Sequence, residues 1–366
     1  MSGPVRVLVV DDSALMRKLI PQILEKDGTI KVVGTAMDGS FGLKKIEELK
    51  PNVVTLDLEM PRMSGIEMMR EITRRYRLPV ILFSAHSREG AQETLKALAL
   101  GAFDFVTKPA NAASGTMEGI ARELAMKIKA AAISGIPKMI AEIPPARLKA
   151  RLPKGQHSRP PTRVIAVGIS TGGPHALEYM LSQIPADFGG CFLIAQHMPE
   201  GFTEMLAKRL DENSMIRVRE ASSGEELIAG QALVCPGNRH LLVRRAPHGH
   251  IAVVSESPRI NGHRPSADVL FRSVAKEFRE RAVALIMTGM GDDGADAIRA
   301  VKDAGGLALA QNSGSCVVDS MPRSAIERGH VNRVLDLEAL PNFLYALCAE
   351  GSAETGRRKG SVVQIR

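Results

Sequence analysis

The segment VRVLVVDD, residues 5–12, is a short run of β-branched and aliphatic residues that ends in two aspartates. Four similar runs follow along the chain: KVVGTA (31–36), NVVTLDL (52–58), PVILFSA (79–85) and FDFVTKP (103–109). The residues between these runs have the apolar spacing of amphipathic helices, as in LMRKLIPQIL at 15–24. Strands that alternate with helices predict a doubly wound parallel sheet of the α/β class.

The polar residues of this first region fall at the ends of the predicted strands. Asp11 and Asp12 close the first strand, Asp57 the third, Ser84 the fourth and Lys108 the fifth. Because the carboxyl ends of parallel strands meet at one edge of a sheet, these side chains are expected in one crevice. Carboxylates are the ligands that Mg²⁺ prefers, and magnesium sites commonly include a phosphate. The sequence therefore predicts a magnesium and phosphate site in this region.

The 366 residues are long enough for two globular domains. We predict a first domain at 1–132, a proline-rich basic linker at 133–162, a second domain at 163–350 and a basic tail at 351–366. The second domain repeats the alternation of strands and helices through five runs: RVIAVGIS (163–170), GCFLIAQH (190–197), ALVCPG (232–237), AVALIMTG (282–289) and GLALAQN (306–312). A second doubly wound parallel sheet is therefore predicted.

The net charge of +8 comes from the two segments outside the predicted domains. Residues 137–162 hold six basic residues against one acidic, and residues 351–366 hold four against one, which gives +5 and +3. The rest of the chain balances at 48 − 10 = 38 basic and 40 − 2 = 38 acidic residues. Neutral domains with 4% aromatic residues and no tryptophan argue against a nucleic-acid partner.

The composition also bears on location. No uncharged apolar run reaches the roughly 18 residues of a membrane-spanning helix, so an integral membrane protein is not expected. Few residues precede the first predicted strand, which leaves no room for a signal peptide. The four cysteines are far apart and form no CxxC pair, as is usual for reduced thiols. We therefore predict a cytoplasmic protein.

The second domain begins with a glycine-rich turn. VIAVGISTGG (164–173) is a strand that leads into a helix, and it fits GxSxG through Gly168, Ser170 and Gly172. Such a turn is either a nucleophile elbow or a cradle for a phosphate or dinucleotide. A dinucleotide cradle needs an acidic residue about 20 residues further on, whereas the next strand ends in Gln196 and His197. A serine nucleophile is the favoured interpretation.

A serine nucleophile needs a histidine base and a carboxylate that orients it. His197 directly follows a strand, at the same predicted sheet edge as Ser170. The strand AVALIMTG ends at that edge too and leads to Asp292 and Asp293. The chain order Ser, His, Asp differs from the Ser, Asp, His order of the α/β-hydrolases. Spacing alone does not decide between the two adjacent aspartates.

The first domain resembles a two-component receiver domain, over roughly residues 5–125. The resemblance implies a flavodoxin-like fold in which Asp57 accepts a phosphoryl group from a histidine kinase, with Mg²⁺ as the cofactor. The implied Mg²⁺ ligands are Asp11, Asp12, Asp57 and the main-chain carbonyl of Glu59. The implied contacts to the phosphoryl oxygens are Ser84 and Lys108.

Three motifs of the second domain resemble the catalytic domain of bacterial chemotaxis protein-glutamate methylesterases, the CheB family. They are GISTGG (168–173), AQHMPEGF (195–202) and MTGMGDDG (287–294). A receiver followed by this domain is the architecture of that family, and the resemblance implies a Rossmann-like fold. The implied site consists of the nucleophile Ser170, the general base His197, the orienting carboxylate Asp293 and the oxyanion-hole amides of Thr171 and Met290.

The resemblance also implies a function. We expect a phosphorylation-activated methylesterase that hydrolyses glutamyl methyl esters on methyl-accepting chemotaxis receptors, and that also deamidates receptor glutamines. The chemotaxis histidine kinase is the expected phosphodonor, and the esterase reaction itself is expected to need no cofactor. The competing hypothesis is a response regulator whose α/β output domain binds a nucleotide or a partner without catalysis. A DNA-binding output is disfavoured because no helix-turn-helix pattern follows the linker.

Overall fold

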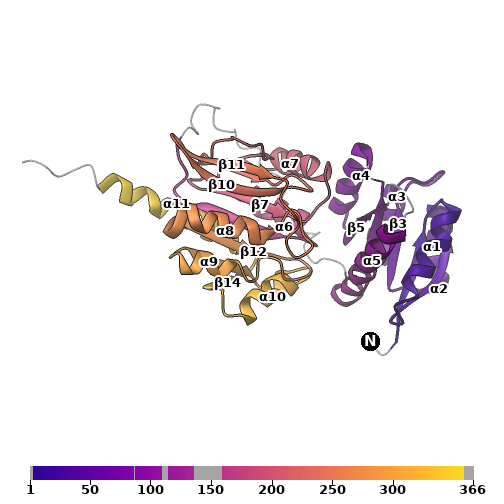
Figure 1. The fold of residues 1–366 in the computed structure, drawn as a ribbon. Coiled ribbons are helices and arrows are strands. Elements are labelled where there is room, and N and C mark those ends of the chain that lie inside the picture. The colour runs from indigo at the N-terminus through magenta and orange to yellow at the C-terminus, as the bar shows by residue number, and fades with distance from the viewer. Residues whose placement is uncertain (1–2, 86, 109–113, 136–158, 358–366) are drawn as a thin grey trace, which may run out of the picture. The chain divides into compact units, whose positions relative to one another are not determined.

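The computed structural model describes residues 3–85, 87–108, 114–135 and 159–357. The chain forms two compact units, Met1–Glu142 and Ile143–Arg366, and each is described by itself (Figure 1). Most of the predicted linker at 133–162 and part of the predicted tail at 351–366 lie outside the described residues. The proline-rich, basic character of the linker is therefore known from the sequence alone.

The first unit is built on a parallel sheet of five strands in the order β2-β1-β3-β4-β5. The strands are β1 (Val5–Val10), β2 (Ile30–Ala36), β3 (Val53–Asp57), β4 (Val80–Ser84) and β5 (Asp104–Thr107). Every residue of β3 and β4 is buried. Parallel strands covered on both faces need such unbroken apolar runs, which is why the runs in the sequence predict them. The predicted α/β class and parallel sheet are confirmed for this unit.

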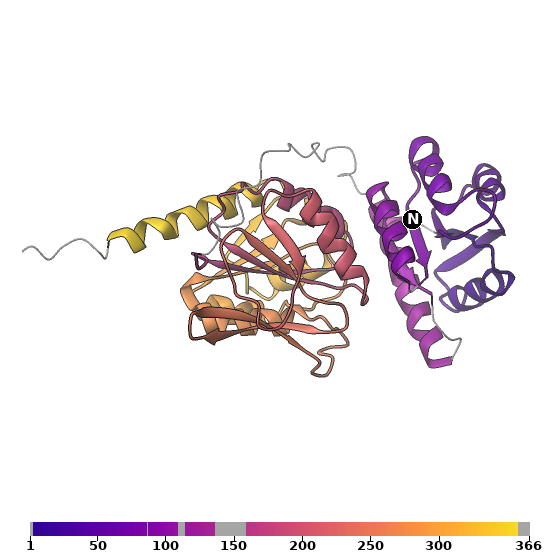
Figure 2. The same cartoon turned by 90° about the horizontal axis from the view of Figure 1, so that it is seen from above.

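Helices cover both faces of this sheet. The helices are α1 (Ala14–Leu24), α2 (Gly39–Leu49), α3 (Gly65–Glu71), the π-helix η1 (Ile72–Tyr76), α4 (Arg88–Ala99) and α5 (Ser114–Ser134). α1 packs against α5, whereas α2, α3 and α4 form a second group (Figures 1 and 2). Ser13, Asp38 and Ser87 accept main-chain hydrogen bonds at the amino ends of α1, α2 and α4, which fixes where these helices begin.

The second unit contains a parallel sheet of seven strands in the order β14-β13-β12-β6-β7-β9-β8. The strands are β6 (Val164–Ile169), β7 (Cys191–Gln196), β8 (Arg217–Glu220), β9 (Gln231–Val234), β12 (Ala282–Ile286), β13 (Leu307–Gln311) and β14 (Arg333–Leu335). β10 (His240–Ala246) and β11 (Gly249–Ser255) form a separate antiparallel hairpin, which the sequence analysis did not anticipate. The second parallel sheet is confirmed.

Two layers cover the seven-stranded sheet (Figure 2). The helices are α6 (Gly173–Ser182), α7 (Phe202–Glu212), α8 (Ala267–Phe278), α9 (Ile298–Asp303), α10 (Ser320–Glu327) and α11 (Leu340–Arg357), with short 3₁₀ turns at Arg279–Arg281 and Ser313–Ser315. The β10–β11 hairpin, α8, α9 and α10 share one buried apolar core with strands β6, β7, β12 and β13. Helix α6 contacts both α7 and α11, apart from this core.

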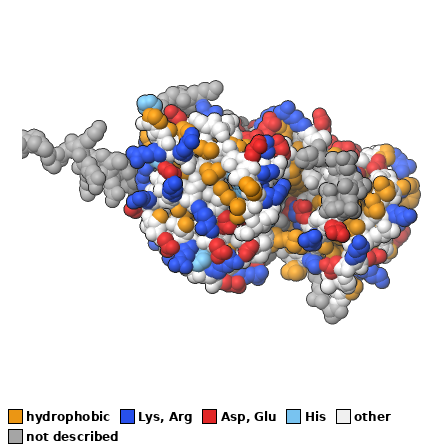
Figure 3. Space-filling view, in the orientation of Figure 1, with side chains coloured by type: hydrophobic (Ala, Val, Ile, Leu, Met, Phe, Trp, Pro, Cys, Tyr) orange, Lys and Arg blue, Asp and Glu red, His pale blue; other side chains and the backbone are white. Residues whose placement is uncertain are grey.

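The surface agrees with the charge balance of the sequence. In Figure 3, acidic and basic side chains are interspersed over the second unit instead of gathering by sign.

No helix in the described ranges combines the length and the apolar character that crossing a bilayer requires.

Candidate active site

The turn that carries Ser170 is held rigidly at the end of β6. The amide of Ser170 donates to the carbonyl of Thr288 at 3.0 Å, and the hydroxyl of Thr288 donates to the carbonyl of Thr171 at 3.0 Å. Gly172 has φ of +79°, a conformation that favours glycine. A Cβ at Gly173 would lie 1.9 Å from Oε1 of Gln196. The glycines therefore let the chain turn sharply after Ser170, which is half-buried in the turn between β6 and α6.

His197 lies beside this turn because β6 and β7 are neighbours. Ile169 pairs with Gln196 in the parallel register, so the next residue of each strand meets at the same edge of the sheet. The amide of His197 donates to the carbonyl of Ile169 at 3.0 Å. The ring Nε2 lies 2.8 Å from Oδ2 of Asp293. A carboxylate there selects the tautomer with the proton on Nε2, which leaves Nδ1 as the basic nitrogen.

Asp293 is buried and receives four hydrogen bonds. Its Oδ2 accepts from His197 Nε2 and from the amide of Ala267 at 2.7 Å. Its Oδ1 accepts from the hydroxyl of Ser266 at 2.7 Å and from the amide of Asp268 at 3.3 Å. The last three donors belong to the amino end of α8, where a helix favours negative charge. Burial alone would raise the pKa of the Asp293 carboxyl, but the bonds from His197, Ala267 and Ser266 lower it below its ordinary value.

The adjacent Asp292 has a different environment. It is exposed, and its Oδ2 accepts from Nη2 of Arg328 at 2.7 Å. Arg328 also pairs with Asp296 at 3.0 Å, so Asp292 belongs to a surface ion-pair cluster. The structure therefore brings Asp293, and not Asp292, to His197.

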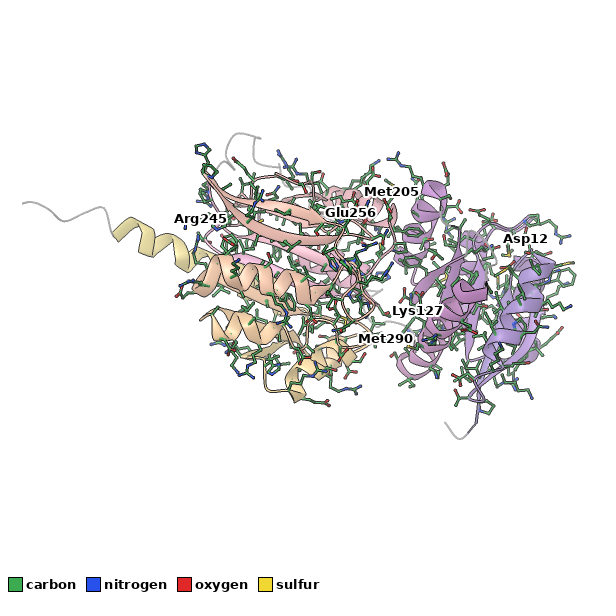
Figure 4. All side chains as sticks on the ribbon, in the orientation of Figure 1. Asp12, Lys127, Met205, Arg245, Glu256 and Met290 are labelled. Carbon is green, nitrogen blue, oxygen red and sulfur yellow. The ribbon has the colours of Figure 1, made fainter. Side chains whose placement is uncertain are left out.

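The loop after β12 places the main chain of Met290 near Ser170. A Cβ at Gly289 would lie 2.8 Å from Cβ of Ser170. The amide of Gly289 donates to the carbonyl of Val318 and that of Gly291 to the hydroxyl of Ser320. The amide of Met290, between them, has no hydrogen-bond partner within the described ranges. Figure 4 places Met290 and Glu256 at one end of this unit and Arg245 at the other.

Two residues of this site were missed by the sequence analysis as functional groups. Gln196 donates through Nε2 to the carbonyls of Ser170 at 3.0 Å and His197 at 3.1 Å, so one side chain ties the two turns together. A polar residue closing a buried strand beside His197 was the available signal. His263 stacks on the ring of His197, with centroids 4.3 Å apart. No signal of spacing or motif pointed to His263.

The first unit also gathers its predicted residues at one sheet edge. Carboxylate oxygens of Asp11, Asp12 and Asp57 lie within 4.8 Å of one another. Nζ of Lys108 lies 2.5 Å from Oδ2 of Asp57 and 3.8 Å from Oδ2 of Asp11. Oδ2 of Asp11 is buried and has no hydrogen-bond partner within the described ranges. Three carboxylate ligands, one of them with a buried oxygen that accepts no hydrogen bond from the described residues, fit a hard divalent cation.

The charges in this pocket are incompletely neutralised. Burial raises the pKa of Asp57 to about 6, although the hydrogen bond and charge of Lys108 oppose the shift. Burial also raises the pKa of Asp11, again against the charge of Lys108. A bound cation would supply the positive charge that one lysine does not.

Glu59 and Ser84 lie beside the pocket. The amide of Glu59 donates to Oδ1 of Asp57 at 3.1 Å. The hydroxyl of Ser84 accepts from that of Thr94 at 2.7 Å, and the amide of Lys108 donates to the carbonyl of Ser84 at 2.7 Å. Ser84 thus lies next to Lys108, with its hydroxyl turned to α4 in this state.

Fold and site define a class of protein: a two-domain α/β chain with an acidic receiver-type pocket in one unit and a Ser-His-Asp arrangement in the other. Residues 7–116 match the family model of the response regulator receiver domain, and residues 165–344 match that of the CheB methylesterase. The chain therefore belongs to the CheB family of protein-glutamate methylesterases, with an amino-terminal receiver domain.

Individual relatives support this membership over most of the chain. The chain is 62% identical over 347 residues to a protein-glutamate methylesterase/protein-glutamine glutaminase of Koribacter versatilis, covering 93% of this chain and 95% of the relative. It is 45% identical to a protein-glutamate methylesterase/protein-glutamine glutaminase of Symbiobacterium thermophilum, covering 95% of this chain and 98% of the relative. The crystal structure of the Thermotoga maritima CheB methylesterase catalytic domain matches with a TM-score of 0.50 and 36% identity, covering 50% of this chain and 98% of that one.

Proposed function

We propose that this chain hydrolyses glutamyl methyl esters on methyl-accepting chemotaxis receptors, with Ser170 as the nucleophile, His197 as the base and Asp293 as the orienting carboxylate. The observation that carries the proposal is the 2.8 Å contact between His197 Nε2 and the buried, ionised Asp293, at the sheet edge where Ser170 directly follows β6. A non-catalytic output domain has no need for a histidine held in one tautomer. The residue ranges 1–132 and 163–350 are proposed as the receiver and catalytic domains.

The geometry supports the following acyl-transfer reaction. The oxygen of Ser170 attacks the ester carbonyl carbon while His197 takes the hydroxyl proton on Nδ1. The C–O bond to the methoxy group then breaks, and the proton on His197 leaves with it as methanol. Water adds to the acyl-enzyme by the same proton transfer, which releases the glutamate carboxylate and restores Ser170. Deamidation of a glutamine follows the same steps with ammonia as the leaving group. This reaction needs no cofactor.

Main-chain amides are proposed to stabilise the tetrahedral oxyanion. The amide of Met290, which has no partner among the residues that the structure describes, lies in the loop that approaches Ser170, and the amide of Thr171 directly follows the nucleophile. Donors aimed at the developing charge contribute about 3–4 kcal/mol each in other acyl-transfer enzymes. The side chain of Met290 is half-buried and takes no part in this role, because only the main chain of this residue would bind the oxyanion.

In the receiver, Asp57 is proposed to accept a phosphoryl group from the chemotaxis histidine kinase. Asp11, Asp12, Asp57 and the carbonyl of Glu59 would hold Mg²⁺, which neutralises charge on the transferred group. Lys108 already contacts Asp57, and Ser84 would contact the phosphoryl group after turning its hydroxyl from Thr94. The strand order β2-β1-β3-β4-β5 supports a flavodoxin-like receiver. The second unit is proposed to be Rossmann-like.

The proposed setting is the cytoplasm, where kinase and receptor signalling domains would meet the chain. Phosphorylation of Asp57 is proposed to raise esterase activity by weakening an inhibitory contact of the receiver with the catalytic domain. A tenfold gain in the open population requires only about 1.4 kcal/mol. The basic segments are not proposed to bind nucleic acid.

The test is methanol release from methylated receptor membranes, measured with and without acetyl phosphate and Mg²⁺. The wild-type chain should release methanol, and faster with the phosphodonor. Ser170→Ala should lose activity by several orders of magnitude, because the triad acts as a unit. Asp57→Asn should keep the basal rate but lose the stimulation. A Ser170→Ala variant that still hydrolyses the ester at the wild-type rate would exclude the proposed nucleophile.

A further inference from the structure

We propose that His263 is a positioning residue for the esterase reaction, and that its flat ring fixes the plane of the His197 imidazole. The two rings are stacked, with centroids 4.3 Å apart and an angle of 9° between their planes. Asp293 holds only one edge of the His197 ring, at Nε2, so the ring could still rotate about that contact. A parallel ring on one face removes this freedom. The inference rests on the proposed function, since it assigns a role in that reaction.

The position of His263 is set by a two-residue turn. The amide of Ile260 donates to the carbonyl of His263 at 3.1 Å, and the amide of His263 donates back to Ile260 at 2.8 Å. Asn261 and Gly262 between them have φ of +49° and +80°. An Asn-Gly pair with positive φ at both positions is the preferred sequence of a type I′ turn. His263 is therefore the last residue of a tight turn whose two ends are hydrogen-bonded to each other.

The loop at 256–266, which carries this turn, is tied to the unit by polar contacts. Oδ1 of Asn238 accepts from Arg264 through Nη2 at 2.7 Å and Nε at 3.1 Å. Nη1 of Arg264 also donates to the carbonyls of Glu256 at 2.9 Å and Ser257 at 3.1 Å. Nε2 of the buried His240 lies 3.1 Å from the carbonyl of Pro258. These contacts give the segment PGNRH, residues 236–240, a role that its sequence did not suggest.

The carboxyl-terminal end of the same loop, at Ser266, contacts the proposed orienting carboxylate. Ser266, three residues after His263, donates to Oδ1 of Asp293 at 2.7 Å. One continuous segment thus contacts Asp293 through Ser266 and His197 through His263. The loop therefore fixes the orienting carboxylate and the proposed base relative to each other.

The charge state of His263 suits this role. Burial lowers the pKa of His263 below its ordinary value, and the charges of His197 and Arg259 act in the same direction. The carboxylates of Asp293 and Asp292 oppose the shift, but do not overcome it. A neutral ring presents an electron-rich face to the imidazolium that forms on His197, whereas a protonated ring would repel it. His263 can therefore support the charged intermediate without competing for the proton.

The test uses the full-length chain and methanol release from methylated receptor membranes. His263→Leu keeps side-chain bulk without a flat ring and should lower kcat about tenfold, with KM changed less than twofold. His263→Phe keeps the stacked ring and should retain at least half of the wild-type kcat. His263→Arg adds a fixed positive charge, which should move the acid limb of kcat/KM to lower pH by at least half a unit, because protonation of His197 becomes less favourable. Circular dichroism and the unfolding midpoint verify the fold of each variant.

The outcomes separate this inference from the proposed function. A wild-type chain that releases no methanol would overturn the function. If the wild-type chain releases methanol and His263→Leu has the same kcat as the wild type, the positioning role alone would be overturned. His263→Phe as slow as His263→Leu, with both folded, would also overturn it, because a flat ring would then be insufficient. If the leucine variant does not fold, the phenylalanine and arginine variants still decide through kcat and the acid limb.

Discussion

Replacing Asp293 with Asn changes one oxygen into a nitrogen at the centre of the proposed triad. Oδ2 of Asp293 accepts from His197 Nε2 and the Ala267 amide, and Oδ1 accepts from Ser266 and the Asp268 amide. An asparagine has one acceptor oxygen, so its NH₂ group must face one pair of donors. If it faces His197, the ring must give up the Nε2 proton and carry it on Nδ1. A protonated Nδ1 cannot accept the proton of Ser170.

The expected loss follows from these contacts. A histidine held in the wrong tautomer lowers kcat by about 10⁴ in a serine protease, which is about 5.5 kcal/mol of transition-state stabilisation. We expect kcat to fall by about 10³–10⁴ in Asp293→Asn. If the NH₂ group instead faces the Ser266 hydroxyl and the Asp268 amide, these buried donors lose their acceptor, which should lower the free energy of unfolding by about 1–3 kcal/mol.

Asp292→Asn is the matched control, because it makes the same chemical change one residue earlier. Asp292 is 58% exposed and pairs with Arg328 on the surface, so its loss should cost less than about 1 kcal/mol of stability. Its kcat should stay within twofold of the wild type. Methanol release and urea denaturation of both variants give the comparison. If Asp292→Asn lost more activity than Asp293→Asn while both remained folded, the carboxylate assignment would be wrong.

Three further predictions concern the linked turns, the acidic pocket and the receiver. Gln196→Met removes the two hydrogen bonds to the Ser170 and His197 carbonyls and should lower kcat about tenfold. Gln183→Met, at an exposed position, is the control and should leave kcat unchanged. Equal rates of methanol release by the two variants would contradict this prediction. Burial raises the pKa of Asp57 to about 6, so above that pH the buried carboxylate is ionised and destabilises the fold. Without Mg²⁺, the free energy of unfolding of Asp57→Asn should therefore exceed that of the wild type by up to about 3 kcal/mol at pH 8. That gain should shrink as the pH falls from 6 towards 4, and a variant less stable than wild type in urea at pH 8 would refute it. A fragment beginning at Arg163 should hydrolyse methylated receptor faster than the unphosphorylated chain; a slower fragment would favour a tethering receiver.

The sheets and their site edges could be predicted from the sequence because parallel strands are simple signals. A strand buried on both faces is an unbroken apolar run, and the polar residue after the run must lie at the carboxyl edge. This reasoning places Asp57, Lys108, Ser170 and His197 without any tertiary information. The structure adds that β6 and β7 are direct neighbours, with Ile169 paired to Gln196.

Spacing does not decide between Asp292 and Asp293; the family resemblance implies Asp293, and the tertiary structure supplies the physical reason why Asp293 contacts His197. Both follow the same strand, and neighbouring residues in a loop have no fixed direction. What selects Asp293 is the amino end of α8, about 25 residues earlier in the chain, whose amides and Ser266 hydroxyl surround its carboxylate. His263 was beyond prediction for a similar reason. The Asn-Gly turn before it is a readable signal, but long-range contacts such as those of Arg264 with Asn238 hold that turn beside His197, and no local pattern predicts them.

The two sites bury carboxylates with opposite results, and the number of donors explains why. Four hydrogen-bond donors surround the single carboxylate of Asp293, so its pKa falls although burial opposes ionisation. In the receiver pocket, carboxylates from three residues share one lysine, and the pKa of Asp57 rises to about 6. A carboxylate that must stabilise an imidazolium through each turnover has to remain ionised without help from solution. A carboxylate that must receive a phosphoryl group with a cation benefits from a pocket that is short of positive charge, because binding of the cation then relieves the repulsion already present.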